Sequence, residues 1–346
     1  MVCLWLPATA HAQPSPCARH DGVALRDVHW RHKQPAHPLI GQVFEGDQPI
    51  AIERDICTRS PLQQLIVEVW DTIRGGGVVL LGEVHDNPEH HAVRGDILWP
   101  RLDRLVSTTN LRPAAVFEHI RTSQQAQLDS FYRHAARSRR LWRAPDLLKE
   151  LGWKDSGWPD SEMFQPLFDA ALWAKQAIYP GNAVRERMRA LARGDRSNVT
   201  QDEQARLDMA EAMPAPLLDA LTAELGGSHC GVVPASAFSV MSLSQRYTDA
   251  HLADALVKAA GTHGGAFLLA GNGHVRTDRG VPWYVRQLAP GRKVVAVMVL
   301  EVEDGKIDAS PYLTRAPDGK VAADYVVFTP RQDRPDPCEK MRQGKS

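Results

Sequence analysis

Two Gly-x-x-His motifs, each directly after a run of apolar residues, constrain this chain more than any other feature. The first motif (GEVH) ends at His85 and the second (GNGH) ends at His274. A third apolar run, residues 114–117, leads to Glu118. Continuously apolar runs are typical of parallel strands that are covered on both faces. Since ligands bind at the carboxyl ends of such strands, the carboxylates and imidazoles predict a binding or active site at that edge.

The length of 346 residues allows one large α/β domain with an inserted module. We expect an α/β fold, with a mostly parallel sheet flanked by helices on both faces and a small inserted all-helical subdomain. Stretches with helical patterning and no strand signal mark this insert. The expected parts are a signal-peptide remnant (1–12), an N-terminal arm (13–60), an α/β core (61–122, 166–182 and 229–330), a helical insert (123–165 and 183–228) and a flexible tail (331–346).

Local signals predict the individual elements. Apolar residues at helical spacing predict a helix over 61–74. Asn87 as N-cap and Pro88 at the first helical position predict another, which should reach about Leu105 with a kink at Pro100. We also expect helices over 123–150, 164–176, 183–225, 244–260 and from Pro282. Strands are expected over 177–179 and over 294–300, which should be the last strand, and a hairpin is expected around 42–44 and 51–52.

Charge and motif content disfavour several classes of protein. Lys+Arg and Asp+Glu number 41 each, and without a basic tract a nucleic-acid partner is not expected. No apolar stretch reaches the roughly 18 residues of a transmembrane helix. The Gly-x-Ser-x-Gly elbow, the Walker loop, the His-Glu-x-x-His motif and a dinucleotide fingerprint after the first strand are missing, which disfavours serine-nucleophile and nucleotide-dependent chemistry.

The N-terminus predicts export. Residues 2–13 contain a short apolar segment and an Ala-x-Ala site that ends at Ala12, as at the end of a secretory signal. We therefore expect a periplasmic or secreted protein. No lipobox precedes Cys17, so a lipid anchor is not expected. The alternative is an ordinary N-terminal segment.

Cysteine usage agrees with export. Cleavage after Ala12 would leave four of the five cysteines, at 17, 57, 230 and 338. An even number permits two disulfides with three connectivities. We favour a bond between Cys17 and Cys57, because both belong to the N-terminal arm.

The two motifs and the third strand end supply the candidate chemistry. Glu83 and His85 are two residues apart, so in extended backbone they point the same way and can hold a divalent metal, or His85 can act as a base oriented by Glu83. The alternative is that both are satisfied polar residues. With His274 and Glu118 they form the predicted catalytic set, and the same four are the candidate metal ligands. Candidate supporting residues are Asp86, His91, Asn182, Gln245, Asp249, Asn272 and Arg276.

Five segments of the chain carry a family resemblance: GEVHDN at 82–87 with His90 and His91, Phe117-Glu118, Gln245 with Asp249, GNGHVR at 271–276 and Gly280-Val281-Pro282. Together they resemble the ChaN family, whose superfamily includes erythromycin esterases and the Tiki/TraB proteins. The resemblance covers about residues 75–300. It implies a parallel sheet with a small helical domain, and haem binding linked to iron acquisition. The ligand to haem in this family is a tyrosine, for which Tyr179, Tyr247 and Tyr284 are unranked candidates.

Three functions remain open at this point. The first is an exported haem-binding protein that takes part in iron or haem uptake. The second is a hydrolase like those of the wider superfamily, in which the two motifs and a glutamate activate water directly or through a divalent metal. The third is a purely structural periplasmic module. Haem or another small molecule is the expected ligand, and a homodimer is the expected assembly.

Overall fold

The computed structural model describes residues 37–51, 60–99, 111–138 and 141–336, together with residues 338, 339 and 342. Its centre is one eight-stranded sheet in the order β2-β1-β8-β7-β3-β6-β4-β5. The six strands from β8 to β5 are parallel, and β1 pairs antiparallel with both β2 and β8. The strands are β1 (Val43–Glu45), β2 (Gln48–Pro49), β3 (Val78–Leu81), β4 (Ala114–Arg121), β5 (Ile178–Asn182), β6 (Ala266–Leu269), β7 (Val294–Glu301) and β8 (Tyr325–Thr329).

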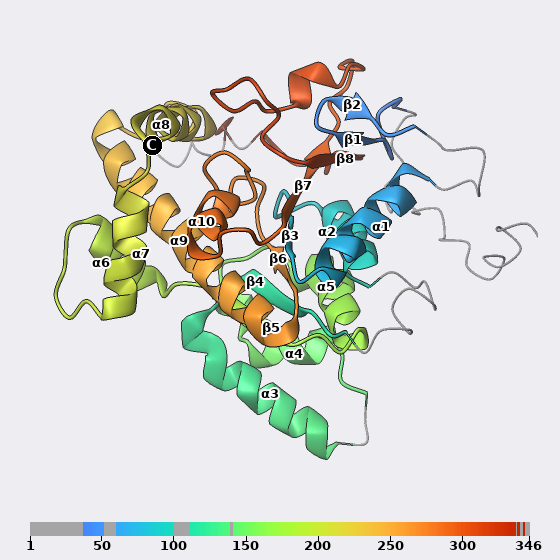
Figure 1. Cartoon of the computed structure of the whole chain (residues 1–346), viewed down its shortest axis with the longest axis vertical. Coiled ribbons are helices and arrows are strands. Elements are labelled where there is room, and N and C mark those ends of the chain that lie inside the picture. The colour runs from blue at the N-terminus through green and yellow to red at the C-terminus, as the bar shows by residue number, and fades with distance from the viewer. Residues whose placement is uncertain are drawn as a thin grey trace, which may run out of the picture.

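Helices cover both faces of this sheet, which confirms the predicted α/β class (Figure 1). Alternate residues of each strand serve the two faces, because successive side chains in a strand point to opposite sides. In β3, Val79 and Leu81 join the core on the face of α1, α2 and α5, whereas Val78 and Leu80 join the core on the face of α9 and α10. These helices are α1 (Pro61–Arg74), α2 (Pro88–Leu98), α5 (Ser161–Trp173), α9 (Phe238–His263) and α10 (Val281–Leu288).

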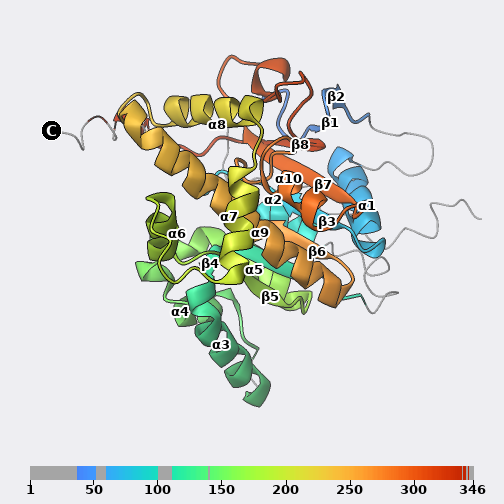
Figure 2. The same ribbon diagram turned by 60° about the vertical axis from the view of Figure 1, so that its left-hand side comes forward.

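The remaining helices extend this core on one side. In Figures 1 and 2, α6 (Arg185–Ala192), α7 (Gln201–Glu211) and α8 (Ala215–Ser228) lie beside α9, against which all three pack. Their small apolar cluster includes Leu191, Leu207 and Tyr247. The helices α3 (Gln125–Arg137) and α4 (Ala144–Glu150) lie below β5 in Figure 1.

Several predicted elements differ from the observed ones. The structure contains β8, a buried apolar strand (YVVFT) that follows β7 in the chain, although β7 was expected to be the last strand. The strand β4 continues past Glu118 to Arg121, because Ile120 remains buried. The helix that begins at Pro88 ends at Leu98 rather than near Leu105. The expected kink at Pro100, the signal segment and the proposed Cys17–Cys57 bond lie outside the described residues.

The edge strand β5 contains Pro180. Proline lacks a backbone N–H, so this outer strand has one hydrogen-bond donor fewer than a regular strand. Among the described residues, no helix is long and apolar enough to cross a membrane.

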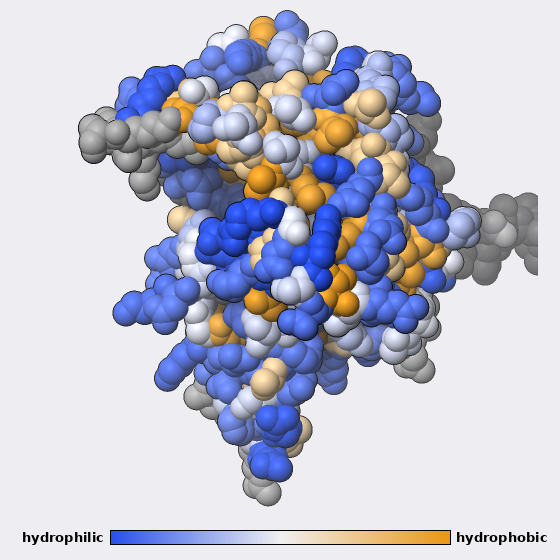
Figure 3. Space-filling model, turned by 90° about the vertical axis from the view of Figure 1, so that its left-hand side faces the viewer, coloured by the Kyte–Doolittle hydropathy of each residue, from blue (hydrophilic) through white to orange (hydrophobic). Residues whose placement is uncertain are grey.

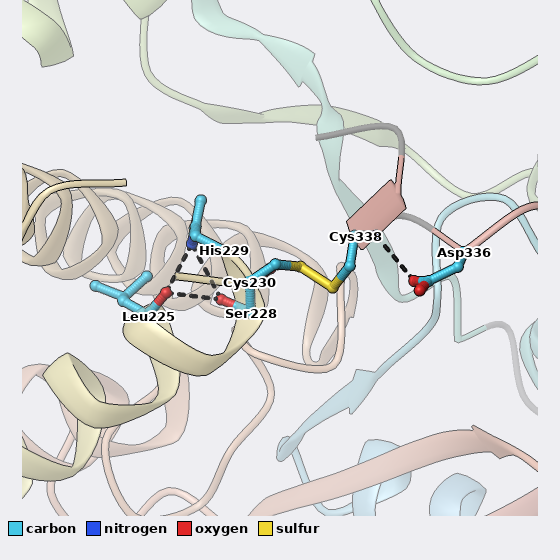
Figure 4. The surroundings of a disulfide bond; sticks show 6 residues. All are labelled: Leu225, Ser228, His229, Cys230, Asp336 and Cys338. Atoms are coloured by element: carbon cyan, nitrogen blue, oxygen red, sulfur yellow. Dashed lines mark hydrogen bonds between the residues drawn. A yellow bond between two sulfur atoms is a disulfide. The ribbon is translucent and has the colours of Figure 1, made fainter. Parts of the chain in front are cut away.

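A disulfide joins Cys230, just after α8, to Cys338, with a Cα–Cα distance of 5.5 Å (Figure 4). The segment expected to be a loose tail is held at a second point, where Arg334 forms an ion pair with Glu301 of β7. Both contacts fasten this part of the chain to the folded body.

Candidate functional site

The site lies where β3, β4 and β6 end. Glu83 and His85 follow β3, Glu118 lies within β4, and His274 lies on the loop after β6. These three strands are neighbours and parallel, with Leu81 paired to Leu269 and Leu269 paired to Phe117. Parallel pairing therefore brings the two Gly-x-x-His motifs and Glu118 to one edge of the sheet, as the sequence predicts.

A polar group, which we call the Glu83 cluster, comprises the half-buried His85 and four buried residues, Glu83, His91, Arg94 and His119. One carboxylate oxygen of Glu83 accepts hydrogen bonds from Nδ1 of His85 at 2.6 Å and from Nε2 of His119 at 2.7 Å. The other oxygen is ion-paired with Arg94 and lies 3.0 Å from Nδ1 of His91. A carboxylate with no exposed surface is costly without partners, and these contacts supply them.

The helix α2 supplies two members of the Glu83 cluster. His91 and Arg94 are three residues apart and therefore share a helix face. Nε2 of His91 donates to the backbone oxygen of His85 at 3.0 Å, which ties the first motif to α2. Burial lowers the pKa of Arg94 to about 9, so its guanidinium is charged at neutral pH and balances Glu83.

Three members of the Glu83 cluster have the composition of a metal site. One ligand atom from each of Glu83, His85 and His119 lies within 4.8 Å of the other two. Burial lowers the pKa of His119 well below its ordinary value, so this imidazole is neutral. Carboxylate and neutral imidazole are suitable ligands for zinc and similar ions. Arg94 disfavours metal binding by these residues, because its positive charge already neutralises that of Glu83.

The second group centres on His274. Nδ1 of its ring lies 2.6 Å from Oδ1 of Asp249 on α9, and Nε2 lies 3.3 Å from Oε1 of Glu118. The amide of Gln245 lies 3.1 Å from Nδ1. The other oxygen of Glu118 accepts a 2.8 Å hydrogen bond from the backbone N–H of Gly271.

The pKa values in this second group depend on one another. Burial lowers the pKa of His274, but Glu118 and Asp249 raise it well above its ordinary value. Burial alone would raise the pKa of Glu118, but His274 and, more weakly, His85 bring it below its usual range. Burial raises the pKa of Asp249 to about 6 despite His274. At neutral pH His274 is therefore an imidazolium between two carboxylates and can donate a proton.

Two glycines allow these groups to approach closely. A Cβ atom on Gly82 would lie 2.2 Å from Oδ1 of Asn272, and one on Gly271 would lie 3.0 Å from Cε1 of His85. The first glycine of each motif is thus needed because the other motif packs against it.

A pocket of about 580 Å³ opens next to the second group, and Glu118 and His274 form part of its lining. Its walls come from the ends of β4 and β5 and from α6, α8 and α9. Apolar contact surface comes from six side chains, Trp158, Ala183, Met188, Leu225, Val240 and Met241. The ring of Trp158 also packs against that of His85, at 4.9 Å between centroids, and so links the pocket to the Glu83 cluster.

Four arginines give the pocket a positive lining. Arg185, Arg189 and Arg193 recur every four residues along and just after α6, so they share one side of that helix, and Arg121 comes from the end of β4. Within the described part of the chain, the three α6 arginines form no ion pair with a carboxylate. Burial and the charge of Arg185 lower the pKa of Arg121. Figure 3 shows this side of the molecule, where hydrophilic side chains predominate over its lower part.

The other predicted site residues divide between the pocket and the scaffold. Asn182 and Gln245 line the pocket, Asp249 holds His274, and Nδ1 of His91 accepts a 2.7 Å hydrogen bond from Arg94, the ion-pair partner of Glu83. Asn272 instead bonds the backbone of Val299 through its amide, and Arg276 pairs with Asp278. Asp86 pairs with Arg334 and does not line the pocket.

None of the three candidate tyrosines lines the pocket. Tyr179 bonds to Nε2 of His263 at 2.9 Å. Tyr247 and Tyr284 are buried in apolar clusters.

Several residues of the site are absent from the sequence-based prediction. Arg94 lies three residues after His91, a helical spacing that could have indicated it. His119 follows Glu118 directly, and neighbouring residues of a strand point to opposite faces. That rule could have predicted that Glu118 and His119 contact different groups, Glu118 contacting His274 and His119 contacting Glu83. The arginines of α6 have a regular spacing, but nothing in that spacing indicates a pocket.

The fold and site define an α/β protein with an arginine-lined pocket at the carboxyl edge of its parallel sheet. The family described as haem-binding uptake, Tiki superfamily, ChaN matches residues 69–285. The match spans more than half of the chain, so the chain belongs to this family, as the motif resemblance predicts. No curated protein sequence matches the chain.

The fold of this chain is similar to that of a solved ChaN structure, and two other solved structures match at lower TM-scores. ChaN of Campylobacter jejuni, solved in a study of cofacial haem binding, is similar with a TM-score of 0.58 and 18% sequence identity, over 82% of this chain and 95% of that one. A Bacillus cereus protein matches with a TM-score of 0.37 and 10% identity, over 75% of this chain and 90% of that one. A succinoglycan biosynthesis protein matches with a TM-score of 0.32 and 12% identity, over 75% of this chain and 73% of that one.

Proposed function

We propose that this protein binds haem in the arginine-lined pocket and takes part in haem or iron uptake. The observation that carries the proposal is the combination of four arginines with apolar side chains around about 580 Å³. Haem needs an apolar slot for its macrocycle and cations for its two propionates. Arginine suits the second task, because its planar guanidinium binds carboxylates in a bidentate manner. Membership of a haem-binding uptake family supports the same reading.

Titration with haemin tests this proposal. The wild-type protein should develop a Soret band that saturates, beyond the change seen with an albumin control. The double variant R189A/R193A should bind haemin at least about tenfold more weakly, since it removes charged contacts to the propionates. The loss should be much smaller with the dimethyl ester of haem, which lacks the free carboxylates.

A matched control comes from α3, where Arg133 and Arg137 have the same spacing and are exposed away from the pocket. The double variant R133A/R137A should bind haemin as the wild type does. Equal weakening by both double variants would mean that the pocket arginines have no specific role. No saturable Soret band in the wild type would refute haem binding itself.

A hydrolase is the second candidate, favoured by the neighbouring Glu83 and His274 groups. A divalent ion held by Glu83, His85 and His119 would activate water, and the imidazolium of His274 would protonate a leaving group. This candidate predicts about one divalent ion per chain in elemental analysis, lost in H85A. A metal-free wild-type protein after purification and incubation with Zn²⁺ would exclude the metal-dependent version.

We also propose that the protein acts outside the cytoplasm. The disulfide between Cys230 and Cys338 supports this, since such bonds persist in oxidising compartments. Fractionation of the native host should place the protein in the periplasm or medium, with a mature N-terminus at Gln13. Intact protein recovered only from the cytoplasm would contradict export.

A further inference from the structure

The pocket contains one imidazole whose outer nitrogen is unengaged. His229 follows directly after α8 and lines the pocket together with His274. Its Nδ1 lies 2.8 Å from the backbone oxygen of Leu225 and 3.2 Å from Oγ of Ser228 (Figure 4). A carbonyl oxygen can only accept, so Nδ1 carries the proton. In the neutral ring Nε2 then bears the lone pair, and it has no hydrogen-bond partner among the described residues.

This arrangement is that of an imidazole prepared to bind a metal. Histidine ligands commonly donate the proton of one ring nitrogen to a backbone carbonyl or carboxylate, which fixes the tautomer and orients the other nitrogen. At His229 the carbonyl of Leu225 fulfils this role.

Among the residues that line the pocket, the other strong ligands for haem iron are engaged or absent. Both nitrogens of His274 face carboxylates. All six tyrosines of the chain lie in described residues, and none lines the pocket. Cys230 is in a disulfide. The thioether of Met188 accepts a hydrogen bond from Thr248. The thioether of Met241 also lines the pocket, and it is a weaker ligand for ferric iron than imidazole is.

Covalent and backbone constraints hold His229 in place. It is the last residue before Cys230, which is bonded to Cys338 and has a left-handed backbone with φ of 56°. The backbone N–H of His229 also donates to Leu225, at 3.2 Å. The imidazole is thus held at a fixed helix end and lines the same pocket as the arginines of α6.

We propose that Nε2 of His229 is the axial ligand of the haem iron in this protein. The proposal rests on the haem binding proposed above and adds the ligand. The iron of a ferric porphyrin would bind Nε2, while the pocket arginines hold the propionates.

Resonance Raman spectroscopy of the reduced haem complex tests the ligand directly. The wild-type complex should show an iron–histidine stretching band. The H229A variant should lack the band, bind haemin at least about tenfold more weakly, and recover the band when imidazole is added. The H134A variant, which removes an exposed histidine of α3 away from the pocket, should match the wild type.

The outcomes distinguish failure of the ligand assignment from failure of haem binding itself. If the wild type binds haemin and H229A keeps both its affinity and its iron–histidine band, His229 is not the ligand. If H85A or H274A alone loses the band, one of those residues takes the role instead and the proposal fails. Far-ultraviolet circular dichroism and thermal melting of H229A distinguish loss of the ligand from loss of the fold. A wild-type protein that binds no haemin refutes the underlying function itself.

Discussion

Nδ1 of His274 lies 2.6 Å from Oδ1 of Asp249, a contact that joins the loop after β6 to α9. Because Glu118 faces the other nitrogen of the ring, the imidazole connects a strand end to a helix at the pocket lining. The same three groups thus place a charged imidazole at the pocket lining and join α9 to the sheet.

The charge on His274 predicts a pH dependence of stability. Glu118 and Asp249 raise its folded-state pKa well above the ordinary value of 6.5. The stabilisation from protonating His274 is therefore complete below pH 6.5 and is lost as the pH rises through the folded-state pKa. Urea denaturation between pH 6 and 10 should show the free energy of unfolding falling for the wild type, with a smaller fall for H274Q. Parallel curves for the two proteins would contradict the assignment.

Removing the charge of Glu83 should destabilise the protein strongly. In E83Q the guanidinium of Arg94 stays buried without its anion, a situation that typically costs about 3–5 kcal/mol. Glu303 offers a matched control, because its contact with Lys306 is exposed on the surface. E303Q should change the free energy of unfolding by less than about 1 kcal/mol. Equal values for the two variants in chemical denaturation would show that the Glu83 cluster is not a stabilising unit.

Gly82 and Gly273, one glycine from each motif, should differ in how well they tolerate substitution by alanine. An added methyl group at Gly82 would collide with Asn272 and with Cγ2 of Val275, so G82A should lose about 1–3 kcal/mol of stability. At Gly273 the nearest atom would be Nε2 of Gln245, at 3.9 Å. G273A should therefore stay within about 0.5 kcal/mol of the wild type in thermal or chemical unfolding. A G82A protein as stable as G273A would contradict the close packing of the motifs.

Loss of the disulfide should lower the free energy of unfolding, because the bond restricts the conformations of the unfolded chain. The bond closes a loop between residues 108 apart, and such bonds typically contribute about 2–4 kcal/mol. The double variant C230A/C338A should unfold at lower urea concentration than the oxidised wild type. Reduced wild type should behave like the double variant, which provides the control. An unchanged midpoint under oxidising conditions would mean that the bond does not form in solution.

Sequence patterns determined the centre of the fold well because its signals are local. The helix α1 begins and ends where predicted, at residues 61 and 74, since Ser60 caps it, Pro61 starts it and Gly75 follows it. The gathering of His85, Glu118 and His274 at one edge follows from parallel pairing alone. By contrast, the prediction omits β8, although its run (YVVFT) is largely apolar and buried throughout, as that of β3 is; its place between β7 and β1 depends on strand pairing, which no local pattern specifies.

The site was harder to predict where it depends on packing between distant segments. The pairing of Arg94 with Glu83 requires α2 to lie against the end of β3. The pocket requires α6 to present Arg189 and Arg193 towards the end of α8. Helical spacing gives the side of α6 on which these arginines lie, but not what that side faces.

Pro180 in β5 has a consequence for how two copies of this chain would associate. An exposed edge strand normally offers a row of N–H and C=O groups onto which another chain can add a strand. The proline interrupts that row at β5, one of the two outermost strands of the sheet. A homodimer is therefore not expected to form by pairing the β5 edges of two molecules into one continuous sheet.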